Sequence, residues 1–522
     1  MIVFLVILFL SCLFPPLFFC WEEYLLPKWY ISLSVICFYF LYFGIKANIS
    51  LKLFKQGVSI AACFGIVFET IWVLGQLLYY GKSVLEIGVC GTFGNPGGLA
   101  VAICLLLSLS FADSESCFFY YTKYKGERRK LFFLSFIFFL AIVLIVLSKS
   151  RTGFVSLTII VLMFIGHIFQ LKKKYMLLIL FILIILVGSI ISFQKTNSTL
   201  GRFFILELTW DLIKERPLCG YGMNGFQYKY MSRQEEYFSL CNTGHEAMLA
   251  DEVLHPLNEF LLLWLDFGII GPIILILLLI MPIWAFRHSF IIKSIQSTLF
   301  LFCLLSYPLN QPLPCLLILF LSFSSIFILF PSSKMFFYKI KKCVLLPITI
   351  LLFLIYIVFL PVDVLMSLGN YKSMVRSHYK SLYYYKKLDS LSMVFPYNLG
   401  MYYRRSSFLY NYSYELFVTA KFNEALEKIN ECSTIMSSYN MELLAGDICL
   451  HHDIPRQALK HYNKAANMCP VRFAPLEGML LAYRNLNDTT HVDSVALVIK
   501  YKPIKVMTYD ITRIKRLVIS LN

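Results

Sequence analysis

The chain is poor in charge: only 15% of its 522 residues are Asp, Glu, Lys or Arg, whereas 59% are hydrophobic. A soluble domain carries about 25% charged and about 45–50% apolar residues, so the composition excludes an ordinary water-soluble enzyme. Acids are the scarcer sign, 30 against 47 basic residues, and the formal net charge is +17. In a chain this apolar, excess Lys and Arg is expected first in cytoplasmic loops, so the charge does not indicate a nucleic-acid partner.

The short motifs that mark metal and nucleotide sites are also missing. The chain has no CxxC pair, no HExxH and no Walker loop. The glycines of GTFGNPGGLA (91–100) lack the strand and the acidic partner of a dinucleotide site, so we interpret them as the start of a span. The metal-binding side chains of one large loop have a spacing that matches no recognised site: His245, Glu246, Asp251, Glu252 and His255. We therefore expect neither a metal nor a cofactor.

Long apolar runs, in contrast, are abundant. They have the length that a helix needs to cross a hydrocarbon core of about 30 Å. They predict an all-α fold, a polytopic membrane helix bundle with about 11 spans. The first run begins at Met1 with no basic segment and no clean cleavage site, which favours an uncleaved span. The predicted spans are 2–20, 29–44, 57–80, 95–112, 131–147, 153–170, 175–193, 257–286, 296–309, 315–331 and 343–361.

Basic residues predict the orientation of these spans. Alternate connections hold 17 of them, whereas the short loops in between hold only Lys28, Lys82, Lys149 and Arg151. Because basic loops stay in the cytoplasm, we expect a cytoplasmic N-terminus and an exterior chain after residue 361. Two long hydrophilic stretches, the loop 194–256 and the tail, then face the exterior. We divide the chain into a transmembrane domain (1–361), a connector (362–401) and a tail domain (402–522).

The tail domain has the pattern of stacked helix pairs. In GDICLHHDIPRQALKHYNKAANMCP, Gly446, Ala458 and Tyr462 follow the spacing of a tetratricopeptide repeat, and Ala425 lies 33 residues before Ala458. A period of about 34 residues places small side chains where two helices cross closely. A generic helical hairpin domain is the alternative. Both predict a role in binding or spacing, not in chemistry.

Two other features outside the spans have two interpretations each. The tyrosines 383–385 lie in a connector rich in Tyr, Lys and Arg, which is typical of an interfacial aromatic and basic belt at a membrane surface. A sugar-binding platform is the alternative. In the large loop, Cys219 and Cys241 form either a disulfide, if the compartment is oxidising, or two free thiols.

The first candidate site residues are two cations in a very short exterior turn. In SKSRTGF, Lys149 and Arg151 stand between two apolar spans, beside the small residues Thr152 and Gly153. Cations at a membrane boundary can simply extend toward lipid phosphates. The same residues also form an anion site at the mouth of the bundle.

The large loop supplies a third cation, Arg202, directly before a predicted helix. The apolar stripe of this helix is Phe203, Leu206, Trp210 and Ile213. After it, Gly220 and Gly222 of CGYGMNGF indicate a tight backbone that can expose N–H groups to an oxyanion or phosphate. Glycine-rich turns after helices are also common without such a role.

The third element is HPLNEFLLLWLDFGIIG, where the loop re-enters the membrane. Beside a basic pocket, His255 becomes a candidate proton acceptor, because the charge of histidine is adjustable near neutral pH. A lone histidine is more often structural or solvated. Glu259 and Asp266 enter an apolar span, which is costly unless they face protein or water, so we expect them to pair with the cationic site.

The order of these features resembles the O-antigen ligase and polymerase superfamily of integral membrane glycosyltransferases. The resemblance rests on SRTGF (150–154), GR…W…I…P…GYG…F (201–226), NEFLLLWLDFGIIG (258–271) and FGNPGGLA (93–100). It covers about residues 90–290. No single motif is specific, but their order, spacing and side of the membrane agree. The tetratricopeptide-like tail resembles an addition that some relatives carry.

The resemblance implies transfer of a glycan from an undecaprenyl-diphosphate carrier to a hydroxyl acceptor on the periplasmic face of a bacterial inner membrane, with no nucleotide sugar and no metal. The diphosphate needs fixed cations, and arginine can bind two oxygens at once. By resemblance, Arg151 and Arg202 bind the diphosphate and His255 takes the acceptor proton. The predicted substrate-binding residues are Lys149, Gly220, Gly222, Asn258 and Glu259.

The sequence departs from the family at one position. Family members commonly have His directly before the Asn that begins the last motif, and here Leu257 stands before Asn258. His255 matches the earlier histidine of the longer family pattern and is therefore the candidate base. His245 and Glu259 are the second choices.

The sequence alone does not decide which acceptor the protein uses or to which class of function it belongs. Lipid A core, another carrier-linked glycan and protein Ser/Thr are the three acceptors within the family, and stacked repeats favour a macromolecular acceptor or a protein partner. A transporter of the same lipid-linked glycan would need charged residues near mid-membrane, where Glu69 is the candidate. A membrane-anchored repeat scaffold is the third class, and it leaves the Arg and His residues unexplained.

Overall fold

The computed structural model describes residues 51–81, 88–113, 125–168, 196–240, 244–329, 350, 362, 364–392 and 402–519. Within these ranges every regular element is a helix and no strand occurs, which confirms the all-α fold. The predicted spans 2–20, 29–44 and 175–193, and all of 343–361 except one residue, lie outside the described residues. The count of about 11 spans therefore stays a prediction.

The chain forms two compact units, which we describe separately. The first contains residues Met1–Gln194, Leu257–Phe260 and Ile273–Pro361. The second contains Lys195–Pro256, Leu261–Pro272 and Val362–Asn522. The large loop thus belongs to the same unit as the tail, although 105 residues of other sequence, from 257 to 361, separate them along the chain.

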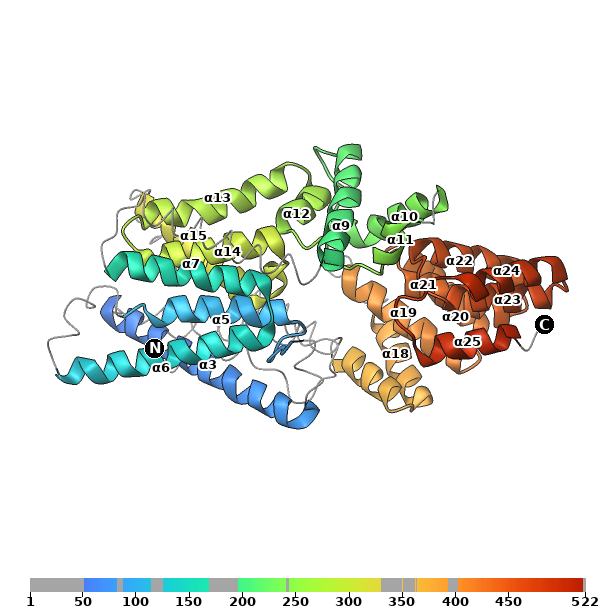
Figure 1. The fold of residues 1–522 in the computed structure, drawn as a ribbon, viewed down its shortest axis with the longest axis horizontal. Helices are drawn as coiled ribbons and strands as arrows, with labels where there is room; N and C mark the ends of the chain where they lie inside the picture. Colours follow the sequence, from blue (N-terminus) through green and yellow to red (C-terminus); the bar gives the residue numbers. More distant parts are fainter. Residues whose placement is uncertain are drawn as a thin grey trace. The chain divides into compact units, whose positions relative to one another are not determined.

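The first unit is a helix bundle with α5 (Pro96–Ser110) at its centre (Figure 1). Every α5 residue from Gly98 to Ser110 is buried. Small polar pairs join neighbouring helices, because Ser108 Oγ lies 2.8 Å from Ser294 Oγ and Ser156 Oγ donates to Thr298 Oγ1 at 3.0 Å. The helices around α5 are α3 (Leu51–Tyr80), α6 (Lys125–Ser148), α7 (Arg151–Ile168), α14 (Phe290–Leu305) and α15 (Pro312–Leu329), and α13 (Ile270–Ala285) completes the bundle.

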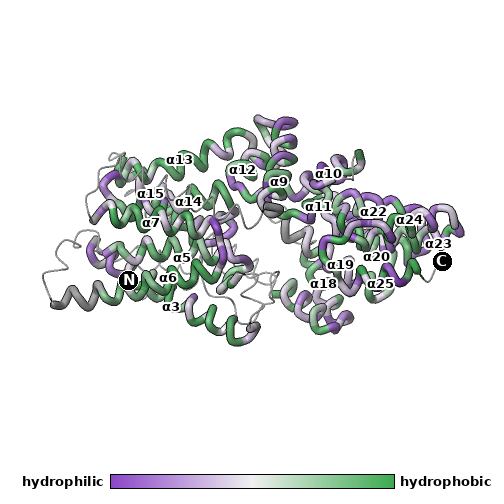
Figure 2. Tube along the Cα trace, in the orientation of Figure 1, coloured by the Kyte–Doolittle hydropathy of each residue, from purple (hydrophilic) through white to green (hydrophobic). Residues whose placement is uncertain are grey.

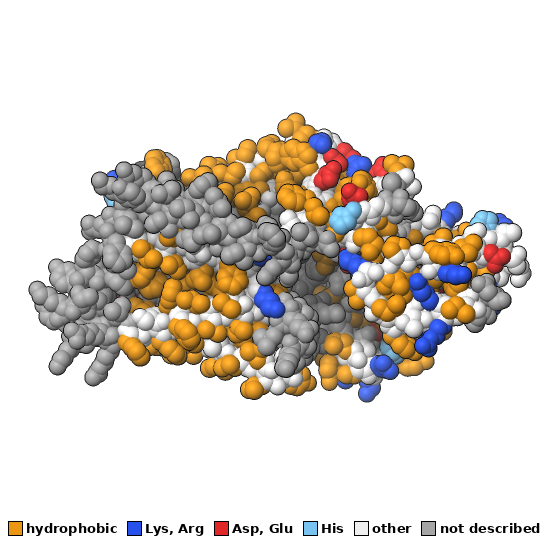
Figure 3. Space-filling view, in the orientation of Figure 1, with side chains coloured by type: hydrophobic (Ala, Val, Ile, Leu, Met, Phe, Trp, Pro, Cys, Tyr) orange, Lys and Arg blue, Asp and Glu red, His pale blue; other side chains and the backbone are white. Residues whose placement is uncertain are grey.

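The described outer surface of this bundle carries many large hydrophobic side chains. Large hydrophobic side chains point outward from α3, α6 and α13, among them Phe64, Ile71, Phe132, Phe139 and Leu277. Figure 2 shows the apolar sequence of these helices and Figure 3 the hydrophobic side chains on one face. Among the described helices, α3 alone is long and apolar enough to cross a membrane by length and composition, and six others are apolar but shorter. A helix that is apolar all round suits a lipid environment.

Two polar side chains of α3 hold the backbone that leads into α5. Glu69 is buried, and its carboxylate accepts hydrogen bonds from the Thr92 amide at 3.1 Å and the Thr92 hydroxyl at 2.6 Å. Two turns further on, Gln76 both donates to the Gly91 carbonyl and accepts from its amide. Glu69, the acid that a transporter would need, therefore has a structural role here.

The tail part of the second unit consists of helix pairs that stack in order. The pairs are α19 (Tyr402–Val418) with α20 (Phe422–Ser433), α21 (Tyr439–His451) with α22 (Pro455–Met468), and α23 (Ala474–Asn485) with α24 (Thr489–Tyr501), followed by α25 (Tyr509–Ile519). Tyr462 is buried between Gly446 and Gly478, where a Cβ atom would lie only 2.5 Å and 2.4 Å from its ring. Small residues thus stand at the close helix crossings, and the tetratricopeptide assignment itself stays a prediction.

The large loop packs on this tail through a shared core. The loop forms α9 (Thr196–Glu215), α10 (Gly225–Leu240) and α11 (His245–Leu249), and the chain continues into α12 (Glu259–Phe267). Buried side chains of α9 and α10, among them Leu208, Phe226 and Tyr230, form one hydrophobic cluster with Ala465 and Met468 of α22. The tail is therefore part of the support on which the loop folds.

The predicted apolar stripe of α9 is buried only in part. Ile213 is buried as predicted, but Phe203 and Trp210 are exposed, at 63% and 41%. The other buried apolar side chains of the helix are Phe204, Leu208 and Leu212. The helix also begins at Thr196, so Arg202 lies inside it and not before it. Two overlapping apolar stripes exist on this helix, and the packing against α10 decides which one is buried.

Candidate functional site

Arg151 and Lys149 lie at the N-terminal end of α7. Lys149 occupies the turn between α6 and α7 with a φ of +52°, and Arg151 is the first residue of α7. The Ser150 hydroxyl accepts a hydrogen bond from the Gly153 amide at 3.2 Å, which caps the helix start. The remaining N–H groups of a helix start carry partial positive charge, so Arg151 adds a full cation to an end that already attracts anions.

A second helix start lies beside the first. Asn95 caps α5 by accepting from the Gly98 amide at 2.6 Å. A Cβ atom on Gly153 would lie 2.8 Å from Ala100 Cβ, and the Val89 amide donates to the Leu147 carbonyl at 3.1 Å. Two helix N-termini and the Lys149–Arg151 turn therefore lie at the same end of the bundle, an arrangement suited to a polyanionic ligand.

The glycine loop after α9 is joined to α12 by backbone contacts. The amides of Tyr221 and Gly222 donate to the carbonyls of Leu265 and Asp266 at 2.8 Å and 2.9 Å, and the Gly220 amide donates to Arg216. Because the N–H groups of Gly220 and Gly222 bond within the chain, they are not free to cradle a phosphate. A Cβ atom on Gly220 would lie 2.5 Å from the Asp266 carbonyl oxygen, so this glycine allows the close approach.

His255 lies between the large loop and α12 and is half-buried. Burial lowers the pKa of its imidazole to about 4, so the ring is neutral at physiological pH. Two residues on, Leu257 has a φ of +57°, a left-handed conformation that a bulky residue rarely adopts. A neutral imidazole next to a strained backbone is compatible with a proton acceptor.

Glu259, the buried acid that follows His255 in the sequence, binds a backbone amide. Glu259 is only 2% exposed, and its carboxylate accepts from the Leu309 amide at 2.9 Å, in the short helix η2 (Pro308–Asn310). Asp266 likewise accepts from a backbone amide, that of Asn224, at 3.3 Å. Burial with a backbone partner makes Glu259 a weaker candidate for base or substrate contact than His255.

The two units divide the predicted site residues between them. Lys149, Arg151, Asn258 and Glu259 belong to the first unit. The exposed Arg202 on α9, with Gly220, Gly222 and His255, belongs to the second. The structure therefore places the predicted site residues in two separate units, and a single site that contains all of them stays a prediction.

One group of polar contacts, which was not predicted from the sequence, holds the His255 loop to the tail. Arg472 Nη2 donates to the Asp251 carboxylate at 2.7 Å, and Asn440 Nδ2 donates to Glu252 at 2.5 Å. Gln234 Nε2 donates to both the Asp251 and the Met468 carbonyls. We call these contacts the loop clamp. They fix the chain four residues before His255.

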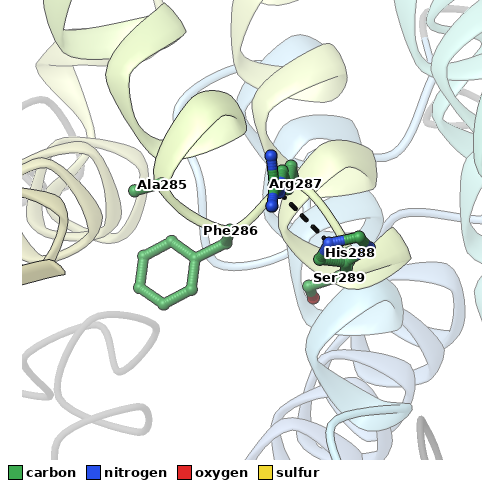
Figure 4. A pocket seen from close by; sticks show the side chains of 5 residues that line it. All are labelled: Ala285, Phe286, Arg287, His288 and Ser289. Atoms are coloured by element: carbon green, nitrogen blue, oxygen red, sulfur yellow. Dashed lines mark hydrogen bonds between the residues drawn. The ribbon is translucent and has the colours of Figure 1, made fainter. Parts of the chain in front are cut away.

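Among the residues that the structure describes, neither a metal cluster, a disulfide nor the surface hollow contributes to this site. Within the described residues no group of three metal-ligating side chains occurs, and Cys219 is an exposed free thiol, while Cys241 lies outside these residues. A small surface hollow is lined by Ala285 to Ser289 (Figure 4). It lies at the start of α14, where Phe290 stacks on His167 near the end of α7, so it is far along α7 from Arg151.

Gly268→Ala tests the backbone contacts between the loop and α12. Gly268 has a φ of +69°, and a Cβ atom there would lie 1.9 Å from the Leu218 carbonyl oxygen. We expect a loss of more than about 2 kcal/mol in stability, measured by thermal unfolding in detergent. Gly75→Ala is the control, because nothing lies within 4 Å of its added methyl group. Equal melting temperatures for both variants would contradict the contact.

Charge reversal tests the loop clamp. Asp251→Arg and Arg472→Asp each place like charges together, and because the pair is exposed we expect protease cleavage of the loop 244–256 to become only about fivefold faster. The double variant Asp251→Arg/Arg472→Asp should recover most of the protection. The same reversal of Arg513 and Glu477, an ion pair between α25 and α23, is the control and should leave cleavage of this loop unchanged. A double variant no better than the single ones would argue against the clamp.

Comparisons with known proteins find a family match over part of the chain. Residues 136–276 match the family model described as O-antigen ligase. No curated protein and no solved structure matches the chain. The matched range runs from α6 to α13 and contains Lys149, Arg151, Arg202 and His255, so it covers three of the motifs that carried the resemblance. The match supports the O-antigen ligase superfamily, a group of membrane glycosyltransferase-like enzymes, for this part of the chain.

Proposed function

We propose that this protein transfers a glycan from an undecaprenyl-diphosphate carrier to a hydroxyl acceptor on the periplasmic face of the inner membrane. The observation that carries the proposal is the end of the bundle where Arg151 begins α7 beside the N-terminus of α5. A diphosphate is both the leaving group and the anchor of such a donor. Helix N-termini and an arginine stabilise that charge without a metal.

Arg202 is the second cation in this proposal. It lies exposed on α9, and α9 is held in place by its buried face and by the tail. In the proposed reaction, both Arg151 and Arg202 bind the diphosphate. Lys149, exposed in the turn before α7, adds charge at the rim. Gly220 and Gly222 serve this site by positioning α12 against the loop, since their amides bond within the chain.

The reaction itself needs one proton acceptor. The acceptor oxygen attacks the anomeric carbon, the bond from that carbon to the diphosphate oxygen breaks, and undecaprenyl diphosphate leaves with the electron pair. His255 takes the acceptor proton as this bond forms, because its imidazole is neutral in the free enzyme. Asn258 provides a polar contact for the acceptor in this proposal. His245 and Glu259 are less suited, the first being exposed on the loop and the second buried against Leu309.

The acceptor is a macromolecule in this proposal. The tail packs directly on the loop that carries Arg202 and His255, so a protein or glycan held by the tail would be close to those residues in the chain's own second unit. Lipid A core, a growing glycan and protein Ser/Thr remain the three acceptors to compare. A transporter is less well supported, since its candidate acid Glu69 binds Thr92.

One transfer assay tests the function. Purified full-length protein is incubated with an undecaprenyl-diphosphate glycan and, separately, with each of the three acceptors. The wild type is compared with Arg151→Ala, Arg202→Ala and His255→Ala. Arg287→Ala is the control, because Arg287 lies at the other end of the same bundle, before α14. Transfer that survives all three substitutions would refute the site, and glycan that crosses a vesicle membrane without transfer would favour a transporter.

A further inference from the structure

A helical hairpin lies in the connector, directly after the last predicted span. It comprises helical residues 364–374, a turn, and α18 (His378–Ser392), and we call it the juxtamembrane hairpin. The turn is tight, because the Ser377 amide donates to the Lys372 carbonyl at 2.8 Å and Arg376 has a φ of +55°. Its tip therefore has a defined shape on which side chains are displayed.

The inner side of the hairpin is fixed to the rest of the second unit. Tyr385 is fully buried, and a Cβ atom on Gly369 would lie 2.7 Å from its ring. The Ser381 hydroxyl donates to the Gly369 carbonyl at 2.9 Å, and Tyr385 also contacts Phe408 and Tyr412 of α19. Of the three consecutive tyrosines in the connector, Tyr385 is thus a core residue and not part of an exposed belt.

The outer side of the hairpin is apolar and exposed. Large side chains with little cover line its tip and the adjoining face of α18: Tyr371 at 49%, Met374 at 59%, Val375 at 51%, Tyr379 at 80% and Tyr383 at 62%. Isolated exposed hydrophobics are normal, but five within 13 residues form a patch that water solvates poorly. Tyrosine, with an apolar ring and a polar tip, is the residue type that favours a membrane interface.

The charge of this patch is of one sign. Lys372, Arg376, Lys380 and Lys387 surround it, and the sequence has no acid between residues 364 and 388. Three acids on or next to the hairpin already have partners: Glu415 contacts His378, Glu424 pairs with Lys386, and Asp389 pairs with Lys428. Because no described acid forms an ion pair with the four cations of the patch, its charge favours an anionic partner.

From these observations we propose that the juxtamembrane hairpin rests on the headgroup layer of anionic lipids, with its aromatic side chains at the acyl boundary and its cations on the phosphates. Connectivity favours this occupant, because the apolar run 343–361 ends only three residues before the hairpin begins. Exposed tyrosines with flanking Lys and Arg are the combination that anchors helices in an anionic interface. Such an anchor fixes the second unit at the membrane surface whatever reaction it supports.

The test measures contact between the hairpin and lipid in the full chain. A Cys219→Ser background removes the exposed thiol of the loop, and an environment-sensitive fluorophore is attached at Tyr383→Cys or, as the matched control, at Tyr509→Cys, which is also exposed but lies on α25. Nanodiscs contain either phosphatidylglycerol or phosphatidylcholine alone, each with a headgroup-attached nitroxide quencher. We expect quenching at position 383 to exceed that at 509 several-fold, and most strongly with phosphatidylglycerol.

Charge variants complete the test. Lys372→Gln, Arg376→Gln and Lys380→Gln together should reduce the quenching at position 383 at least threefold in phosphatidylglycerol discs. A triple variant with the same charge change elsewhere on the tail, Arg456→Gln, Lys460→Gln and Lys505→Gln, should leave it unchanged. Thermal unfolding verifies that both are folded. Equal quenching at positions 383 and 509 would overturn the proposal. A fluorophore at position 383 that is shielded from water but not quenched by the lipid nitroxide would also overturn it, and would favour a protein partner.

Discussion

His255→Ala should lower the rate of glycan transfer by about 10²–10⁴-fold, the usual contribution of a general base. The acceptor hydroxyl is a poor nucleophile until its proton is removed. In the proposed site the donor diphosphate binds through residues other than His255, so KM for the donor should change little while kcat falls. Single-turnover transfer with saturating donor measures the chemical step directly.

The pH profile distinguishes a base from a structural histidine. Burial depresses the pKa of His255 to about 4 in the free protein, so kcat/KM should stay flat down to about pH 5 and fall only near pH 4. A bound diphosphate brings negative charge and raises this pKa, so the acidic limb of kcat should lie at higher pH than that of kcat/KM. If His255 has only a structural role, its titration should not determine the acidic limb of either kcat or kcat/KM.

The same pKa has a consequence for stability. Because the unfolded chain binds a proton near pH 6.5 and the folded one only near pH 4, the unfolded state holds more protons between these values. The contribution of His255 to stability is therefore present above pH 6.5 and is lost as the pH falls toward 4. His255→Ala removes this dependence.

His245→Ala is the matched control for His255. His245 begins α11 on the same loop and is exposed. Its substitution should leave both the rate and the acidic limbs in place. Loss of transfer in the His245 variant with a normal rate in the His255 variant would move the base to His245 and contradict the assignment.

Arg151→Ala should reduce transfer about 10²–10³-fold, the cost of removing one preorganised group that stabilises developing charge. The loss should appear in kcat as well as in donor binding, because negative charge builds on the diphosphate as it leaves. Arg151→Lys should recover only part of the rate, since lysine keeps the charge but lacks the planar fork. Binding of the donor and single-turnover rates separate the two effects.

Two matched variants delimit the role of Arg151. Lys149→Ala, in the same turn, removes one exposed cation and should cost less than tenfold. Arg287→Ala, at the other end of the bundle, should have no effect. An Arg151 variant with normal transfer would leave the cation with a membrane-boundary role only.

The sequence predicted those features that depend on composition and local spacing. Apolar runs led to the all-α fold, because only internal hydrogen bonding can satisfy a backbone in such surroundings. The positions of Ala425, Ala458 and Tyr462 led to stacked helix pairs, and all three are fully buried. The motifs around Arg151, Arg202 and His255 led to the family that residues 136–276 match.

The sequence predicted less well those features for which the fold selects one of two similar residues, or one of two hydrogen-bond partners. The amides of Gly220 and Gly222 fit an anion site from sequence, yet carbonyls of α12 and Arg216 accept their hydrogen bonds. In the predicted α9 stripe Ile213 is buried but Phe203 is exposed, because Phe203 and Phe204 are equally apolar and only packing selects between them. Tyr383 and Tyr385 likewise look alike in sequence but differ completely in burial.

The sequence by itself determined the helical fold, the apolar surface of the bundle and the residues eligible for chemistry. The tertiary structure alone decided that the large loop and the tail form one unit. Asp251 and Arg472 are 221 positions apart, and no periodicity connects them, because a contact at such a separation depends on how completed helices pack. The pKa of His255 was decided in the same way, since burial is a property of the assembled fold and not of the HPLN motif.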